Sequence, residues 1–310
     1  MHPPSVKYGC HPSLTGIFDF PLLLMVVVEM TAGTLYNNAK AILKMTGIEN
    51  YSQEAFYIIE KATGIKKHEL PIKENMPLDN SIIEEVNGYV NRRKSGEPLQ
   101  YILGEWEFYS FNFKVGEGVL IPRQDTETLV ESVLESLKDF KEPVVVDLCS
   151  GSGCIAISIE KMCKGSKVFA VELSDMAIPY LQKNINENNS SVKLTKGNVC
   201  DSKTLDNLPQ ADMIVSNPPY ITAQDMKCLQ KEVTFEPEMA LAGGDDGLHF
   251  YRAITALWKD KLKENGILAF ECGINQHKQI EEILKENGFD DICFKEDLCG
   301  IIRVVKGRKK

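Results

Sequence analysis

The residue types best suited to chemistry form one tetrapeptide of the 310-residue sequence: Asn217, Pro218, Pro219 and Tyr220. The two prolines stiffen the chain and lack N–H groups, so the stretch presents acceptors without competing backbone donors. The side-chain oxygen of Asn217 and the carbonyl of Pro218 can each accept one N–H of a planar amide or amino group. This turns the nitrogen lone pair toward an electrophile and stabilises the positive charge that develops on nitrogen. We predict that Asn217, Pro218 and Tyr220 are catalytic and that all four residues bind the substrate, with Tyr220 packed against its planar group.

A short glycine loop follows an apolar strand earlier in the chain. Residues 144–148 read Val-Val-Val-Asp-Leu and lead into Cys-Ser-Gly-Ser-Gly at 149–153, after which a helix is expected. Glycines let the backbone approach a ligand closely, and free N–H groups at a helix start offer donors. The next strand ends at Glu172, 21 residues after Gly151, where a carboxylate can accept hydrogen bonds from both hydroxyls of a ribose. Together these features predict a site for a nucleoside-bearing cofactor.

The spacing of the loop distinguishes two such cofactors. A dinucleotide loop follows G-x-G-x-x-G, but Cys149 or Ser150 holds the first glycine position here and Ala156 the last. The arrangement D-x-x-x-G-x-G looks like the loop that binds S-adenosylmethionine, which has no pyrophosphate to cradle. Asn198, after the third strand, is either an adenine contact or a plain turn residue. We predict S-adenosylmethionine as the cofactor, bound by the following residues: Asp147, Cys149, Ser150, Gly151, Ser152, Gly153, Glu172, Asn198 and Asn217.

The elements around these motifs place them at one edge of a sheet. From residue 143 onward, apolar segments of strand length alternate with helical ones, which indicates parallel strands joined by helical crossovers. The last two strands have only a short turn between them and should pair antiparallel. We predict an α/β fold with a seven-stranded, mostly parallel, Rossmann-like sheet and an antiparallel edge strand. The strands are expected at 144–148, 168–172, 192–195, 213–216, 267–271, 292–295 and 301–305, and the helices near 154–162, 176–187, 248–262 and 276–287.

The first third of the chain follows a different pattern. Apolar residues recur at helical spacing from Thr31 to about Gly96, and aromatic and β-branched residues alternate around Ser110, which is typical of a hairpin. We predict a helical substrate-recognition domain at 30–98, a β-hairpin linker at 99–118 and the cofactor-binding domain at 119–310. Residues 1–29 are expected to be a non-structural extension, because a normal-looking helical sequence begins at Met30. Their apolar run is too short to span a membrane and lacks a signal cleavage site.

The composition of the chain limits the kinds of partner and setting that can be expected. The net charge of −9 argues mildly against a grip on nucleic-acid phosphates, so no nucleic-acid partner is expected. Nine cysteines without a C-x-x-C pair indicate reduced thiols, a cytoplasmic setting and no metal site. No segment has the roughly 20 apolar residues of a membrane helix, so no membrane contact is expected. A monomer is expected, with a solvated basic tail formed by Lys306, Arg308, Lys309 and Lys310.

Five segments carry a resemblance to a known family. They are Pro-Arg-Gln-Asp-Thr-Glu at 122–127, the loop at 147–153, Asn-Pro-Pro-Tyr at 217–220, Phe-Glu-Pro-Glu-Met-Ala-Leu at 235–241 and Gly-Gly-Asp-Asp-Gly at 243–247. Together they resemble the release factor glutamine methyltransferases, also called the HemK or PrmC family, over roughly residues 31–307. Asn-Pro-Pro-Tyr is shared with adenine and cytosine amino-methyltransferases, and the segment at 122–127 narrows the match.

The resemblance implies a fold, an activity and several residue roles. The fold is a helical N-terminal domain, a hairpin and a Rossmann-like methyltransferase domain. The activity is methylation of the side-chain amide nitrogen (N5) of the glutamine in the Gly-Gly-Gln motif of class I peptide-chain release factors, with S-adenosylmethionine as donor. By likeness, Val199 lies beside the adenine and Asn217 binds the substrate amide, while Arg123 and Glu127 support the cofactor pocket and the domain interface.

Three positions depart from the family pattern. Glycine usually stands where this chain has Cys149, and we expect cysteine to be tolerated unless the position requires a positive φ. Aspartate is more common at position 198, where asparagine keeps an acceptor and loses the charge. A second acidic residue is usual in the segment before Arg303, and we expect its absence to leave catalysis unaffected.

Two other interpretations of the motifs stay open. An adenine amino-methyltransferase acting on DNA or RNA would need a flipped-out base and a basic channel at the catalytic turn. The neighbouring sequence is mainly acidic, with Asp225, Glu232, Glu236, Glu238, Asp245 and Asp246 against Lys227 and Lys231. A non-catalytic binding module of the same fold would show loss of Asn217 or of the glycine loop, and both are present.

Overall fold

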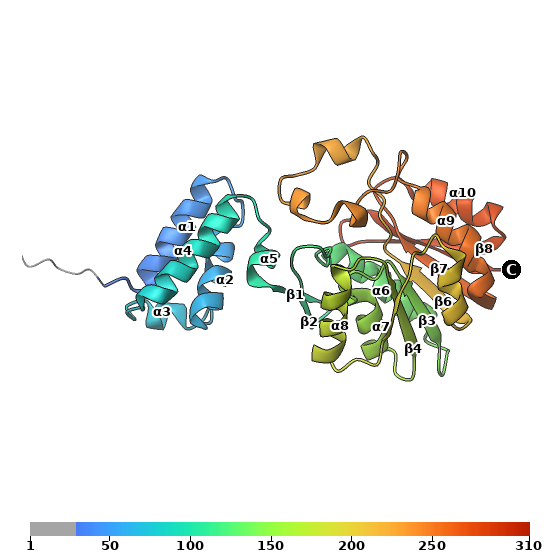
Figure 1. The fold of residues 1–310 in the computed structure, drawn as a ribbon, viewed down its shortest axis with the longest axis horizontal. Coiled ribbons are helices and arrows are strands. Elements are labelled where there is room, and N and C mark those ends of the chain that lie inside the picture. The colour runs from blue at the N-terminus through green and yellow to red at the C-terminus, as the bar shows by residue number, and fades with distance from the viewer. Residues whose placement is uncertain (1–28) are drawn as a thin grey trace, which may run out of the picture.

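The computed structural model describes residues 29–310, which form a bundle of helices beside a larger α/β unit (Figure 1). The chain enters the bundle at Met30, whose carbonyl accepts the N–H of Leu78 at 3.0 Å. The expectation that residues 1–29 are an extension concerns residues that, apart from Glu29, lie outside the described range. None of the helices in this range is both long and apolar enough to cross a bilayer.

The bundle contains three main helices, which confirms the helical pattern of the N-terminal sequence. They are α1 (Ala32–Met45), α2 (Tyr51–Thr63) and α4 (Asn80–Lys94), with the short α3 (Leu70–Lys73) between the last two. The Thr31 side chain caps the start of α1, and Gly64 ends α2 in the left-handed conformation. Their apolar faces meet in a core of their own that includes Leu35, Ile58 and Val86, so the bundle buries its own apolar surface.

A short helix and a hairpin connect the bundle to the sheet. The strands β1 (Glu105–Phe108) and β2 (Phe111–Lys114) pair antiparallel around the predicted turn at Ser110. The prediction of a hairpin from residue 99 was wrong at its start, because α5 (Leu99–Leu103) occupies those residues. Pro98 precedes this helix and Gly104, with φ 74°, ends it, so proline and glycine delimit a helix inside an otherwise β-like stretch.

The large unit is built on a seven-stranded sheet, as predicted. Its strands are β3 (Val144–Leu148), β4 (Lys167–Glu172), β5 (Lys193–Lys196), β6 (Ala211–Ser216), β7 (Leu262–Glu271), β8 (Phe289–Glu296) and β9 (Ile302–Lys309). They lie in the order β5-β4-β3-β6-β7-β9-β8, and β3 to β7 pair in parallel. The predicted antiparallel pairing at one edge is confirmed. The reversed strand is β9, which lies between β7 and the outermost strand β8.

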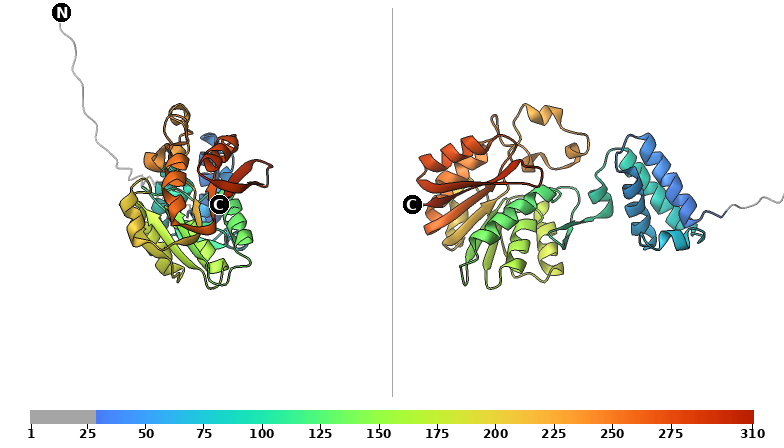
Figure 2. Two further views of the ribbon diagram at one scale, coloured as in Figure 1. Left: turned by 90° about the vertical axis from the view of Figure 1, so that its right-hand side faces the viewer. Right: turned by 180° about the vertical axis from the view of Figure 1, so that it is seen from behind.

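Helices cover both faces of the sheet (Figure 2). One face packs against α6 (Glu127–Ser136), α7 (Cys154–Met162) and α8 (Ala177–Glu187), and the other against α9 (His249–Trp258) and α10 (His277–Glu286). Four of these five helices match the predicted crossovers, whereas α6 was not predicted. The buried valines of the strands face both layers, which is why these strands read as continuous apolar runs in the sequence.

The basic C-terminal cluster is part of the sheet, and the prediction of a solvated tail was wrong. Lys306 lies in β9 and donates to the Ser132 carbonyl at 3.2 Å and the Ser136 hydroxyl at 2.8 Å, near the end of α6. Lys309 donates to the carbonyls of Lys259 and Leu262 at 2.8 and 3.0 Å. Both lysines in this strand thus donate to oxygens of neighbouring elements, a use that charge patterning alone does not reveal.

Candidate active site

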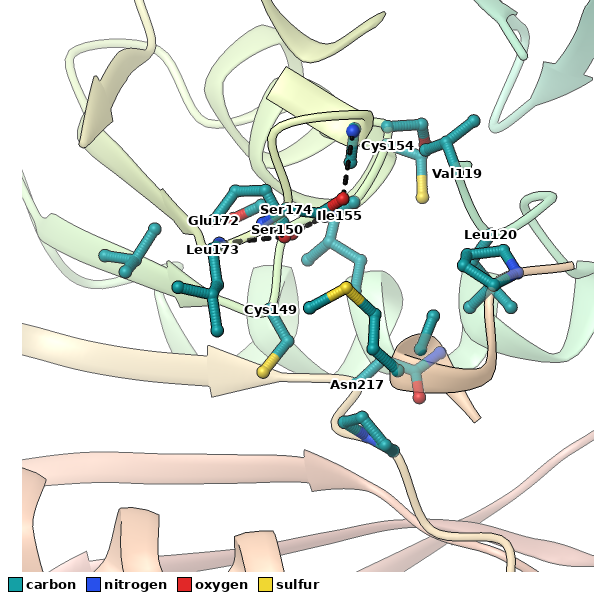
Figure 3. A pocket seen from close by; sticks show the side chains of 18 of the residues that line it. Val119, Leu120, Cys149, Ser150, Cys154, Ile155, Glu172, Leu173, Ser174 and Asn217 are labelled. Carbon is teal, nitrogen blue, oxygen red and sulfur yellow. Dashed lines mark hydrogen bonds between the residues drawn. The ribbon is translucent and has the colours of Figure 1, made fainter. Parts of the chain in front are cut away.

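The carboxyl ends of three neighbouring strands surround one cavity. The loop after β3, Glu172 at the end of β4 and Asn217 directly after β6 all line it, with Asn217 on the opposite side from Glu172 (Figure 3). Ten of the residues predicted for the site line this cavity: Arg123, Cys149, Ser150, Gly151, Ser152, Glu172, Asn198, Val199, Asn217 and Pro219. Asp147, Gly153, Pro218 and Tyr220 do not.

The glycine loop makes its sharp turn with three left-handed residues. Cys149, Gly151 and Gly153 have φ values of 60°, 52° and 83°. Gly153 is required for packing, because a Cβ there would lie 2.2 Å from a Leu181 methyl group on α8. Cys149 therefore has the positive φ at which we did not expect cysteine to replace glycine without cost, because a side chain at positive φ is strained. Burial raises the pKa of its thiol, so Cys149 stays a neutral part of the wall.

Glu172 joins the loop to the tip of β4. Its Oε2 accepts the Gly151 N–H at 2.7 Å, and its Oε1 accepts the N–H groups of Leu173 and Ser174 at 2.8 and 2.7 Å (Figure 3). A carboxylate has about four acceptor positions, so three backbone bonds leave capacity for a hydroxyl in the cavity. Glu172 therefore shapes the loop and can still take part in binding a ribose.

Asp147 lies beneath the loop and is fully buried. Burial raises its pKa to about 8, against the lowering effect of the Ser150 hydroxyl and the Ala156 N–H. The Ser150 hydroxyl donates to the Asp147 backbone carbonyl at 2.9 Å, and neither carboxyl oxygen of Asp147 has a hydrogen-bond partner among the described residues. Asp147 thus contacts the loop from below, on the side away from the cavity.

The far wall of the cavity follows β5. Asn198 forms a turn there, with its Oδ1 accepting the Cys200 N–H at 2.9 Å, and it also lines the cavity. The two interpretations of this residue are therefore compatible. The neighbouring Val199 is buried, and its carbonyl accepts the indole N–H of Trp258 at 2.8 Å. Together with the loop, this wall gives a concave, largely apolar site with few polar groups, which suits a nucleoside.

Apolar residues outside the predicted site complete the cavity. They are Val119 and Leu120 after the hairpin, Met239 in the segment at 235–241 and Phe250 in α9. Sequence reasoning gave none of them a place in the site, because they come from segments far apart in the chain. They supply the apolar surface that an adenine or a methionine side chain requires.

Asn217 is oriented by a neighbour in the segment at 122–127. Its Nδ2 donates to the Thr126 hydroxyl at 3.3 Å, which leaves its Oδ1 available as an acceptor. Among the described residues, the Pro218 carbonyl takes part in no hydrogen bond. Both acceptors of the predicted mechanism are therefore uncommitted within the chain.

The Gly-Gly segment after the motif supports the turn from behind. The Gly243 N–H donates to the Ile221 carbonyl at 2.8 Å. A Cβ on Gly243 would lie 2.6 Å from Tyr220 Cα and 2.9 Å from the Pro219 carbonyl oxygen. Only glycine lets the backbone come this close, which explains why this segment accompanies the tetrapeptide.

A second cavity begins on the other side of Asn217. Its lining includes Tyr220, Glu271, Gln276 and Arg303. The two cavities share Leu120, Arg123, Asn217 and Ala240. Asn217 therefore lies where the two cavities meet. A molecule bound in one cavity can face a molecule bound in the other across this residue.

Arg123 and Glu127 tie the site to neighbouring segments. The guanidinium of Arg123 pairs with the buried carboxylate of Glu236, which also accepts the Ile121 N–H at 3.1 Å. Glu127 accepts the Tyr109 N–H from the hairpin turn at 2.8 Å. Arg123 thus holds a segment beside the cavity that it lines, and Glu127 holds the hairpin turn.

Comparison with known proteins identifies the family. Residues 34–104 match the PrmC N-terminal domain and residues 124–244 match the methyltransferase small domain. The release factor glutamine methyltransferase of Fusobacterium nucleatum is 38% identical over 282 residues, which cover 89% of this chain and 78% of that protein. The one from Geobacter sulfurreducens is 38% identical over 263 residues, or 84% of this chain and 91% of that protein.

Solved structures support the same fold. The hMettl16 catalytic domain, crystallised with a MAT2A 3′UTR hairpin, superposes with a TM-score of 0.53 at 17% identity, covering 69% of this chain and 82% of that one. At this identity the likeness concerns the fold alone. The sequence relatives carry the assignment further: the chain belongs to the release factor glutamine methyltransferase family, whose members are S-adenosylmethionine-dependent enzymes.

Proposed function

We propose that this protein methylates the side-chain amide nitrogen (N5) of the glutamine in the Gly-Gly-Gln motif of class I peptide-chain release factors. The observation that carries the proposal is the position of Asn217 at the junction of two cavities. The cavity beside Glu172 takes S-adenosylmethionine, and the cavity beside Tyr220 takes the glutamine side chain. The names of the relatives, each a release factor glutamine methyltransferase, supply the substrate class.

The reaction needs alignment more than it needs a base. The bound cofactor supplies a sulfonium methyl group, which is a strong electrophile. An amide nitrogen is a poor nucleophile, because its lone pair is delocalised into the carbonyl. Asn217 Oδ1 and the Pro218 carbonyl accept its two N–H bonds and hold the nitrogen facing the first cavity. The same acceptors stabilise the positive charge on the methylated nitrogen, which then loses a proton readily.

The proposal assigns each predicted residue a role. Asn217, Pro218, Pro219 and Tyr220 bind the substrate amide, with Tyr220 against its plane in the second cavity. Asp147 and Gly153 act on the cofactor through the loop. The remaining predicted residues contact the cofactor or, for Arg123, hold the wall of its site: Arg123, Cys149, Ser150, Gly151, Ser152, Glu172, Asn198 and Val199.

The domain organisation and setting form part of the same proposal. The helical region at 30–98 recognises the release factor, the linker at 99–118 connects it, and the domain at 119–310 carries out the transfer. A separate hydrophobic core in the helical region supports this division. A monomer in the cytoplasm completes the proposal.

Incubation with isotope-labelled cofactor and a purified class I release factor tests this function. Mass spectrometry should find one added methyl group on the Gly-Gly-Gln peptide and none when that glutamine is replaced by alanine. An oligonucleotide in a parallel reaction tests the adenine alternative. Label in the oligonucleotide, or on another peptide, would contradict the proposal.

The variant Asn217→Ala tests the mechanism. It should abolish transfer to the release factor, because the acceptor for one amide N–H is removed. Its dissociation constant for S-adenosylmethionine, measured by calorimetry, should stay within about twofold of wild type, since one contact at the cavity edge is lost. Undiminished turnover in this variant would contradict the proposed alignment.

A further inference from the structure

A buried carboxylate lies beside the catalytic asparagine without a full set of partners. Ser216 of β6 lies opposite Phe270 of β7, so Asn217, directly after β6, lies beside Glu271, the last residue of β7. Glu271 is 2% exposed, and within the described chain its Oε2 has no hydrogen-bond partner. Such a group costs stability, so its presence at the floor of the second cavity calls for a function.

The neighbours of Glu271 form a directional chain. Thr126 and Asn217 both lie next to its carboxyl group and lower its pKa, and Asn217 Nδ2 donates to the Thr126 hydroxyl at 3.3 Å. An ionised carboxylate accepts hydrogen bonds and cannot donate one, and a hydroxyl has a single proton and donates only one hydrogen bond. When Thr126 gives that proton to Glu271, it can only accept from Asn217. Asn217 must then present its NH₂ to Thr126 and its oxygen to the junction of the cavities.

We propose that Glu271 is a positioning residue which, through Thr126, holds the Asn217 carboxamide with its oxygen facing the acceptor amide. This inference rests on the proposed function for the identity of that amide. The oxygen and the NH₂ of a carboxamide are nearly equal in size, so sterics alone do not prevent the group from flipping and exchanging their places. With its NH₂ facing the substrate NH₂, two donors would oppose each other and the alignment would be lost.

The direction of the chain depends on the charge of Glu271. A protonated Glu271 can donate to Thr126, which then donates to Asn217 and reverses the order. Burial raises the pKa of Glu271 to about 7, while Thr126, Arg303 and Asn217 lower it and Asp125 raises it. The charged groups around it are Arg303 of β9, which pairs with Asp297, and Asp125 of the segment at 122–127, which also pairs with Arg303. The phenol of Tyr220 and the thiol of Cys272 face it as well. The ionised form is the aligned one, so turnover rises with pH through about 7.

Four variants separate this role from general stability. Glu271→Gln keeps the shape and an acceptor for Thr126 at every pH, so it should retain much of kcat and lose the acid limb of the pH profile. Glu271→Ala and Thr126→Val should lower kcat by roughly 10- to 100-fold, as for other lost orienting bonds. Their affinity for S-adenosylmethionine should stay unchanged. Glu282→Gln on the exposed side of α10 is the matched control and should behave as wild type.

A double variant tests whether Glu271 acts through Thr126. Thr126→Val combined with Glu271→Ala should be no slower than Thr126→Val alone, because the chain from Glu271 to Asn217 is already broken. A further loss in the double variant would overturn the positioning role. A wild-type pH profile and kcat in Glu271→Ala would also overturn it. Circular dichroism establishes that each variant is folded.

A measurement without substrate keeps the two proposals distinguishable. In ¹⁵N NMR, the side-chain NH₂ signals of Asn217 should shift as pH passes through 7 in wild type and stay constant in Glu271→Gln. Constant signals in wild type would overturn the inference even if methylation is observed. Absence of release factor methylation with these shifts present would contradict the proposed function alone.

Discussion

At the scale of single residues, two of the buried carboxyl groups near the site, Asp147 and Glu271, have opposite surroundings. Glu271 borders a cavity and has a proposed role in alignment, whereas Asp147 is sealed beneath the glycine loop. Burial raises the pKa of both. A carboxyl group that holds its proton more tightly in the folded state makes folding weaken as pH rises. These residues therefore link the stability of the active site to pH.

The variant Asp147→Asn should show this link. In wild type the pKa rises from 3.8 in the unfolded chain to about 8 in the folded one. The stability contributed by the protonated group is complete below 3.8 and is lost as pH rises to about 8. Asparagine has no such loss, so the variant should melt at a higher temperature than wild type at pH 8, with a smaller difference at pH 5. Equal melting curves at every pH would contradict the buried-carboxyl explanation.

At the scale of elements, the site depends on the contact between the glycine loop and α8. Gly153 starts α7 at positive φ, and its missing Cβ makes room for Leu181. The loop is therefore pressed against a helix as well as held by Glu172. Its conformation follows from packing, and any cofactor contact is built on that packing.

Gly153→Ala should lose both stability and cofactor affinity. Its Cβ would meet Leu181 at 2.2 Å, which adds a packing cost to the backbone strain for a total of about 3 kcal/mol. Gly288→Ala is the matched control, because Gly288 has φ 86° and no atom near its Cβ position. That control should cost only about 1 kcal/mol. Denaturant unfolding and calorimetry measure the two effects, and equal losses would contradict the packing explanation.

Much at this scale could be predicted, because the strands and the motif spacings are local patterns. The parallel strands read as apolar runs, and the tetrapeptide and the loop could be placed at their ends. The helix at 99–103 could not be distinguished, since its five residues are too few to show a period. Lys306 and Lys309 read as a tail because their carbonyl partners lie far away in sequence. Glu271 belongs to no sequence motif, and it comes to lie beside Asn217 only through the register of β6 and β7.

At the scale of the whole molecule, one ion-pair network joins the helical region to the wall of the second cavity. Arg93 of α4 is 4% exposed and bonds Glu54 of α2 at 2.5 Å and Glu232 at 2.6 Å. Glu232 belongs to the segment between β6 and α9, which extends toward the helices (Figure 1). Next to it, the Lys231 side chain packs against Gly96, with its Cε 2.7 Å from where a Cβ on that glycine would be. The helical region therefore contacts the segment that encloses the proposed substrate.

Glu232→Gln should weaken recognition of the release factor without affecting the chemistry. The variant removes the negative charge that pairs with Arg93 between the two regions, and it leaves the ion pair of Arg93 with Glu54 intact. We expect KM for the release factor to rise several-fold, with kcat and cofactor affinity unchanged. Arg92→Ala is the control, because Glu97, near the end of α4, is its one ion-pair partner in the described part of the chain. A KM no higher than that of the control would show that this contact has no part in recognition.

The place of β9 between β7 and β8 has a consequence for how the chain reaches its native state. In the described fold β8 pairs with β9 alone, so it stays without a neighbour until β9 has been added. During that interval β7 presents an open, apolar edge, which is a template for pairing with other chains. The final insertion buries Val304 and Val305 completely. Aggregation during refolding should therefore depend on how fast β9 pairs with β7.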